Sequence, residues 1–183
     1  MADIVIKTLS ASDIDSEMLM DFKHRQIISK KWVHTEAGWE LTDSYDIAEW
    51  SAKKRKWIAS YLCGHIERGG YVIGAFCGDV IVGFCSVDGE LSGNTAKYAN
   101  LTMLFVDDDW QRRGIGKKLF AAICDCAIAL NADKLFISAV PSYETVAFYF
   151  CVGCSDAEET IPEFVDTEED RYLEYDLKKA PAL

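Results

Sequence analysis

The sequence predicts a single α/β domain built on a mixed central sheet of about six to seven strands flanked by helices. The chain has 183 residues, the usual size of one domain, and half of them are hydrophobic. Short apolar runs typical of strands alternate with segments whose apolar residues recur at helical spacing. No repeat or linker interrupts this order, so residues 1–183 are expected to form one domain.

The first third of the chain predicts a strand, two helices and a loop. Residues 3–9 alternate between apolar and polar as a strand does. Ser12 is a suitable N-cap for a helix that carries apolar residues up to Phe22. Residues 30–46 show little periodicity and predict a structured loop. Asp46 and Glu49 then resemble a capping box for a helix that ends at Gly64.

The remainder predicts three strands, a helix, a strand, a helix and a last strand. Gly78-Asp79 separates two apolar runs and predicts a tight hairpin. Apolar positions from Leu119 onward predict a helix, and Ser142 is a suitable cap for a second helix that ends at Gly153. The strands are expected at residues 71–77, 80–87, 97–106, 133–140 and 171–177, and residues 155–170 are acidic and irregular.

Composition narrows the range of partners. The formal net charge of -11 argues against nucleic acid, which needs a broad basic face, and suits a cationic small molecule. No run of about 18 apolar residues and no signal peptide pattern is present, which predicts a cytoplasmic protein without a membrane span. The seven cysteines include a Cys151-x-x-Cys154 pair without a second ligand pair, so core packing is expected and a metal site is not.

One short stretch stands out from this acidic background. Residues 110–118, WQRRGIGKK, place four cations and two glycines between a predicted strand and a predicted helix. The first turn of a helix has backbone N–H groups without partners, and glycine lets a ligand approach them. The stretch therefore predicts an anion site, most suitably for phosphate. The alternative is a solvated turn whose cations offset the carboxylates of residues 107–109.

Two segments together resemble the GNAT superfamily of N-acetyltransferases. Gln111-x-x-Gly114-x-Gly116 is similar to the acyl-CoA signature of this family, which reads Gln or Arg, two residues, Gly, one residue, then Gly or Ala. Residues 147–154, AFYFCVGC, are similar to a later segment in which a helix carries Phe-Tyr and ends in Gly-Phe. The chain departs from the pattern at Cys154, where the family has Phe, and at Ser142, where Asn is common.

The resemblance implies acetyl-CoA as co-substrate and a set of residues that bind it. The backbone of residues 111–117 would hold the pyrophosphate, strand residues 104–106 would pair with pantetheine, and the neighbouring strand would splay away to leave a slot for the thioester. Ser142 would contact the pantetheine less firmly than Asn. The implied cofactor-binding residues are Leu104, Phe105, Val106, Gln111, Arg112, Arg113, Gly114, Ile115, Gly116, Lys117 and Ser142.

The resemblance also implies direct attack of an amine on the thioester. Tyr149 matches the family's usual general acid for the leaving thiolate, whereas the residues alone would favour a core aromatic. Family members often have Glu in the strand before the signature, and this chain offers Asn100 and Thr102 there. The base therefore stays open between a water chain ending at Asp43, His34 or Glu36 and the C-terminal acidic segment.

Residues 30–65 are expected to cover the acceptor site. Their aromatic and acidic side chains suit a cationic amine or form a buried lid; they are Trp32, His34, Glu36, Trp39, Asp43 and Tyr45. The sequence thus predicts an N-acetyltransferase for a small-molecule amine, with a homodimer possible. The alternatives are a protein or peptide N-acetyltransferase and a non-catalytic acyl-CoA-binding module.

Overall fold

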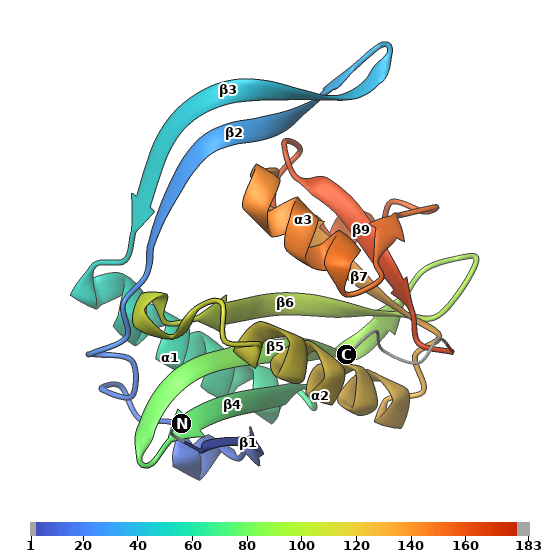
Figure 1. The fold of residues 1–183 in the computed structure, drawn as a ribbon. Helices are drawn as coiled ribbons and strands as arrows, with labels where there is room; N and C mark the ends of the chain where they lie inside the picture. The colour runs from blue at the N-terminus through green and yellow to red at the C-terminus, as the bar shows by residue number, and fades with distance from the viewer. Residues whose placement is uncertain (1–2, 179–183) are drawn as a thin grey trace.

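Seven strands form a central sheet in the order β1-β4-β5-β6-β7-β9-β8 (Figure 1). The computed structural model describes residues 3–178. Only β6 and β7 pair in parallel within the described chain, so the predicted mixed sheet is confirmed. The strands are β1 (Ile4–Leu9), β4 (Tyr71–Cys77), β5 (Val80–Ser92), β6 (Tyr98–Val106), β7 (Lys134–Ala139), β8 (Ser155–Asp156) and β9 (Arg171–Asp176).

Three helices cover the two faces of this sheet. Helix α1 (Ala52–Glu67) packs on one face through Ile58 and Leu62. Helices α2 (Ile115–Ala129) and α3 (Tyr143–Cys151) contribute to the core on the other face. The apolar positions of α2 recur every three or four residues, which is why that helix buries one side completely against the strands. The predicted helices at these positions of α2 and α3 are confirmed.

A second, two-stranded sheet replaces the loop that residues 30–46 predicted. Strands β2 (Arg25–Thr35) and β3 (Gly38–Glu49) form a long antiparallel hairpin that extends away from the central sheet and leans toward α3 and β9 (Figure 1). The register shifts between Ile28 and Lys30, so side chains change faces part-way along the hairpin. Both faces are also partly exposed. The two-residue alternation that would have predicted strands is therefore absent.

The helix predicted from Ser12 does not form. A 3-10 turn, η1 (Ala11–Asp13), follows Ser10, whose N–H and hydroxyl both donate to the Asp13 carboxylate at 2.8 and 2.6 Å. Asp15 likewise accepts from the Glu17 N–H at 2.8 Å. Short polar side chains that bond the nearby backbone favour turns over helix. The expected apolar contacts survive, because Leu19 and Phe22 are buried under α1.

The boundaries predicted for α1 are wrong at both ends. Asp46 pairs with Ile28 in the hairpin, and the cap is Ser51, whose hydroxyl accepts from the Lys54 N–H at 3.2 Å. Gly64 lies inside the helix, where a single glycine costs only about 1 kcal/mol. The chain leaves the helix beyond Glu67, where Gly69 adopts a φ of 83°.

The remaining predicted elements are confirmed with small shifts. Gly78 has a φ of 59° in the turn between β4 and β5, and Gly153 has a φ of 102° after α3. Strand β5 extends beyond its predicted end to Ser92. The acidic segment after α3 is mostly irregular, with β8 and the short turn η3 (Pro162–Phe164). Among residues 3–178, no helix is both long and apolar enough to cross a membrane.

Candidate active site

The central sheet opens between β6 and β7. Their pairing covers three positions, Tyr98 with Lys134, Ala99 with Leu135 and Asn100 with Phe136. Both strands then continue without pairing to each other, β6 to Val106 and β7 to Ala139. Leu104, Phe105 and Val106 are half-buried along the unpaired part. The splayed strands expected from the resemblance are therefore present, with the backbone of β6 along one side of the gap.

The chain turns sharply between the open end of β6 and the start of α2. Asp107 caps the short turn η2 (Asp108–Trp110) by accepting from the Asp109 N–H at 2.9 Å. Gln111 donates from Nε2 to Asp108 Oδ1 at 2.9 Å, which fixes the exit from this turn. Arg112 and Gly114 then adopt positive φ values of 60° and 79°. Because Arg112 and Gly114 both have left-handed backbone conformations, the N–H groups between them are exposed to solvent instead of being buried.

The backbone N–H groups of this turn are free to bind a ligand. From Gln111 to Lys117, none of them donates a hydrogen bond to another residue within 3–178. A side chain at Gly114 would meet nothing within 4 Å, so the space in front of these donors is open. At Gly116, by contrast, an added Cβ would lie 3.1 Å from Phe148 of α3. The first glycine leaves room for a ligand, and the second lets two helices pack closely.

The cations of the turn are not used to neutralise the aspartates before it. Asp107 Oδ2 accepts from the Lys23 N–H and Asp108 Oδ2 from the Arg25 N–H, both at 2.7 Å. Asp109 forms an ion pair with Lys23 at 2.6 Å. Within the described chain, none of the four cations in residues 112–118 forms an ion pair. This arrangement favours an anion site over a solvated turn.

Arg113 is the one cation of the turn that is held in place. Its Nη2 donates to the Asp109 carbonyl at 2.9 Å, and its guanidinium lies 4.7 Å from the Trp110 ring. Arg112 and Lys118 are exposed, and Lys117 is half-buried. The turn therefore combines free N–H groups, a helix N-terminus and unpaired positive charge, which together suit a phosphate or diphosphate.

Ser142 is the N-cap of α3 and follows the end of β7 that does not pair with β6. Its hydroxyl accepts from the Thr145 N–H at 3.1 Å, so the predicted cap is confirmed. The hairpin contacts the same residue, because Gln26 Nε2 donates to the Ser142 hydroxyl at 3.2 Å. The Trp32 N–H also donates to the Pro141 carbonyl at 2.7 Å. The hairpin is thus fixed to the start of α3.

Tyr149 lies in the core between α2, α3 and β5. It is 7% exposed and packs edge-on against Phe120, with ring centroids 6.4 Å apart. Burial raises the pKa of its phenol, and the neighbouring Cys154 and Cys85 thiols raise it further. The phenol therefore stays protonated at neutral pH, as a proton donor must. The aromatic packing fits a core aromatic, and the raised pKa makes the phenol a weaker acid toward a thiolate, whereas its protonated state is what a proton donor requires.

The comparisons with known proteins agree with this geometry. The model of the acetyltransferase (GNAT) family matches residues 26–151. The chain belongs to this family. The match includes the turn between β6 and α2, the ends of β6 and β7 that do not pair with each other, and Tyr149. A search of curated proteins found no match to this GNAT protein.

Several solved structures share the fold at low sequence identity. A nourseothricin acetyltransferase has a TM-score of 0.63 and 13% identity, over 95% of this chain and 96% of that chain. PaiA N-acetyltransferase from Thermoplasma acidophilum, in complex with coenzyme A, has a TM-score of 0.61 and 19% identity over 95% and 99%. A mutant AtaT toxin, bound to the antitoxin AtaR and acetyl-CoA, has a TM-score of 0.59 and 16% identity over 96% and 94%.

The aromatic residues expected to cover the acceptor site are partly engaged within the GNAT domain itself. The Arg171 guanidinium lies 4.9 Å from the Trp32 ring, 4.9 Å from the Trp39 ring and 5.0 Å from the Phe150 ring. It also donates to both carboxylate oxygens of Asp156, at 2.6 and 2.8 Å. The other residues predicted for this region are exposed on the hairpin; they are His34, Glu36, Asp43 and Tyr45.

The C-terminal acidic segment lies beside the part of β7 that does not pair with β6. Ser138 of β7 donates its hydroxyl proton to Asp170 Oδ2 at 2.8 Å and accepts from the Asp166 N–H at 3.1 Å. Asp166 is exposed at its surface, but partial desolvation raises the pKa of its carboxyl, and the charge of Asp170 raises it further. The C-terminal acidic segment, one of the proton acceptors that the sequence left open, thus contains a carboxylate of raised basicity.

Sequence reasoning missed Ser138, Asp170 and Arg171. One signal was available, because Arg171 is the only cation between Ser155 and Asp176 in the sequence. A lone cation in an acidic segment indicates a specific partner, here the Asp156 carboxylate and three aromatic rings. Ser138 and Asp170 gave no such signal, since their pairing depends on the tertiary fold.

A buried histidine also escaped sequence reasoning. His65 of α1 is 1% exposed, and its Nδ1 faces Arg68 Nη2 at 3.1 Å. Because a guanidinium can only donate, Nδ1 accepts and the imidazole proton lies on Nε2, 3.0 Å from the Thr102 hydroxyl. This tautomer has no free lone pair to take a proton from Thr102. His65 therefore positions Thr102 in β6 and does not act as its base.

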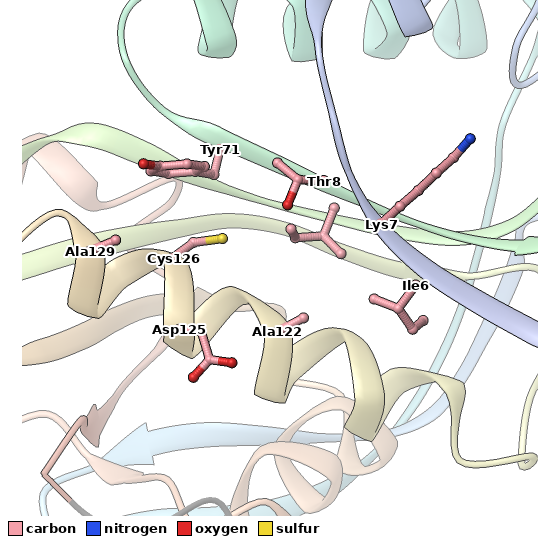
Figure 2. Close-up of a pocket in the computed structure, with 9 residues that line it drawn as sticks. Ile6, Lys7, Thr8, Tyr71, Ala122, Asp125, Cys126 and Ala129 are labelled. Atoms are coloured by element: carbon pink, nitrogen blue, oxygen red, sulfur yellow. The ribbon is translucent and has the colours of Figure 1, made fainter.

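A pocket of about 300 Å³ lies away from this site. It is an open depression lined by residues of β1, β4 and α2 (Figure 2). Figure 2 shows Lys7 extending away from α2, while the Cys126 thiol points toward the strands. Strand β1 forms the opposite edge of the sheet from β7 and β9. No group of three His, Cys, Asp or Glu residues suited to a metal ion occurs in the part of the chain that is described.

Proposed function

We propose that this protein transfers the acetyl group of acetyl-CoA to a primary amine of a small molecule. The row of free N–H groups from Gln111 to Lys117, opened by Gly114, carries this proposal. Such a row at a helix N-terminus matches the oxygens of the coenzyme A diphosphate. Membership of the GNAT family and the coenzyme A bound in PaiA support the same ligand.

The remaining part of the cofactor would follow the gap between β6 and β7. Backbone groups of residues 104–106 that have no partner on β7 can pair with the amides of pantetheine. A backbone N–H near Leu104 would polarise the acetyl carbonyl as charge develops on its oxygen. Arg112 and Arg113 would flank the phosphates, and Ser142 would lie beside the pantetheine at the other side of the gap.

The reaction needs a neutral amine, whereas an alkylammonium has a pKa near 10. The amine would give one proton to a base, attack the carbonyl carbon, and expel the thiolate as the carbon–sulfur bond breaks. We assign the base to the C-terminal acidic segment, with Asp166 as its candidate, because the pKa of its carboxyl is raised and its N–H bonds to Ser138 of β7. Tyr149 would protonate the leaving thiolate and regain its proton through solvent.

The test is release of coenzyme A thiol from acetyl-CoA across a panel of small amines, peptides with free N-termini and lysine peptides. Turnover on small amines is the expected result. Turnover on peptides alone would favour a protein N-acetyltransferase. Calorimetric binding of acetyl-CoA without turnover on any amine would contradict the enzyme and leave a non-catalytic acyl-CoA-binding module.

A further inference from the structure

A second pocket lies between the hairpin, the end of β7 and the C-terminal acidic segment. Its volume is about 180 Å³. Pro141 and Ser142, which line it, follow the end of β7 that does not pair with β6, so the pocket lies near the gap between β6 and β7. The full lining is Ile28, Lys31, Asp46, Val140, Pro141, Ser142, Thr167, Glu169 and Asp170.

The pocket carries a net negative charge that the protein does not neutralise. Asp46, Glu169 and Asp170 line it with one cation, Lys31, which forms no ion pair with any carboxylate in the described part of the chain. Arg171 follows Asp170 directly, but its guanidinium is held by Asp156 within the aromatic rings of the hairpin and α3. Arg171 therefore does not neutralise the pocket, and Lys31 offsets only one of its three carboxylates.

Asp170 is the strongest sign of a missing partner. Its side chain belongs to a residue only 7% exposed, and its Oδ2 accepts from the Ser138 hydroxyl. Its Oδ1 accepts no hydrogen bond within residues 3–178 and is not among the fully buried atoms, so it is accessible to a ligand in the pocket. A cation or donor that reaches this oxygen would stabilise the mostly buried carboxylate. The nearby Asp166 adds to the negative potential.

The rest of the lining suits an alkyl chain. Ile28, Val140 and Pro141 are apolar, and the volume corresponds to about six water-sized groups at ~30 Å³ each. An ammonium group on a short methylene chain matches both the charge and the size. Strong carboxylates raise the pKa of an ammonium, which opposes its deprotonation, so the group held here is not the one that reacts.

We propose that this pocket binds a second, unreactive ammonium group of the acceptor, with Asp170 as its main partner and Asp46 and Glu169 in support. The acceptor would then carry at least two amino groups, one in the pocket and one at the thioester. This inference rests on the proposed acetyl transfer, because only that reaction makes the bound diamine an acceptor. The binding of a diamine can nevertheless be measured without turnover.

The experiment compares 1,4-diaminobutane with butylamine by calorimetry on the full chain saturated with coenzyme A. The diamine should bind at least tenfold more tightly than the monoamine. Asp170→Asn and, separately, Asp46→Asn should each remove most of this preference. Glu168→Gln makes the same change of charge on an exposed neighbour outside the pocket and should change the affinity less than twofold. Thermal melting confirms that each variant is folded.

Turnover gives a second, independent readout. Asp170→Asn should raise the KM for the diamine at least tenfold and leave the KM for acetyl-CoA unchanged. Equal affinity for the two amines, or a preference for the diamine that persists in both Asp→Asn variants, would overturn the proposed ammonium site. If either amine is acetylated in that case, the proposed transferase activity still stands. Diamine binding that depends on Asp170 without acetylation of any amine keeps the cation site and overturns the transferase.

Discussion

At Gly114 the backbone has a φ of 79°, and no atom lies within 4 Å of the position where a side chain would begin. A side chain there disfavours the left-handed conformation by roughly 1–2 kcal/mol, but it collides with nothing in the protein. If the diphosphate binds at this turn as proposed, substitution at Gly114 should change binding more than it changes the fold.

Gly114→Glu should abolish calorimetric binding of acetyl-CoA, because a carboxylate would occupy the space of the diphosphate and repel it. The loss expected is at least 100-fold in affinity, or about 2.7 kcal/mol. Gly114→Ala has the same backbone strain without the charge, so its loss should be clearly smaller. Acetyl-CoA binding to the Glu variant with wild-type affinity would exclude this turn as the diphosphate site.

Tyr149→Phe should lower kcat by at least 100-fold and leave the affinity for acetyl-CoA near the wild-type value, since a general acid typically contributes ~10²–10⁴ in rate. Tyr143→Phe is a matched control, because Tyr143 is 48% exposed at the start of the same helix. Steady-state kinetics and calorimetry distinguish the two variants. If both turn over equally, Tyr149 is a core aromatic.

At the scale of elements, the β2–β3 hairpin is held by a few specific contacts rather than by a wide apolar interface. Gln26 and Trp32 bond to the start of α3, and Trp32 and Trp39 pack on the Arg171 guanidinium. Ile27 and Ile47, paired with each other across the hairpin, are 52% and 45% exposed. The position of the hairpin over the second pocket therefore depends strongly on Arg171.

Arg171→Met should lower the free energy of unfolding by about 2 kcal/mol, because it removes cation–π contacts and leaves Asp156 without its partner. Amide hydrogen exchange should accelerate in β2 and β3 much more than in the central sheet. Lys30→Met, on the same hairpin and without an ion pair in the described chain, should change neither. Unchanged exchange in the hairpin of the Arg171 variant would contradict this anchor.

Helices and strands whose apolar residues recur at a regular spacing were predictable from the sequence, and the β2–β3 hairpin was not. Strand β4 is a short run of apolar residues, and α2 repeats its apolar residues at helical spacing, so local sequence suffices for both. The hairpin has a register shift near Ser29 and two partly exposed faces, which removes any simple alternation. Ser10 and Asp13 similarly bond the local backbone and end a helix that the apolar spacing alone favours.

The candidate site divides in the same way. The anion-binding turn is continuous in sequence, so its glycines, cations and neighbouring elements could be interpreted together. The second pocket combines Asp46, Ser142 and Asp170, which are far apart along the chain and meet through the hairpin and the bond from Ser138 to Asp170. No local sequence pattern predicts that these three residues lie close together in the fold. The geometry of the turn was therefore more predictable than that of the second pocket.

At the scale of the whole molecule, an ion pair between Glu174 and Lys134 joins β9 to β7 at the end of the sheet opposite the gap. Glu174 of β9 accepts from Lys134 of β7 at 2.7 Å and from the Tyr98 hydroxyl of β6 at 2.8 Å. These contacts lie at the only paired positions between β6 and β7. Burial alone would raise the pKa of the Glu174 carboxyl, but the bonds from Lys134, Tyr98 and the Glu158 N–H outweigh it and lower the pKa.

Glu174→Gln should lower the free energy of unfolding at pH 7 by about 3 kcal/mol, because Lys134 would lose its most buried partner. The folded pKa of Glu174 lies below its unfolded value, so the contribution is complete above pH 4.5 and disappears as pH falls through the lowered value. Melting temperatures from pH 7 to pH 3 should therefore converge for the two proteins. Glu163→Gln, at an exposed position, should follow the wild type throughout.

The short ladder between β6 and β7 has a consequence for the range of thioesters that this protein can accept. Beyond Asn100 no backbone bond joins the two strands, so the separation of the strands there is not fixed by main-chain geometry. We therefore expect the length of the acyl group to be limited by the bulk of the side chains at the mouth of the gap. Tolerance of propionyl or longer groups should therefore be adjustable by trimming those side chains, with the main chain left as it is.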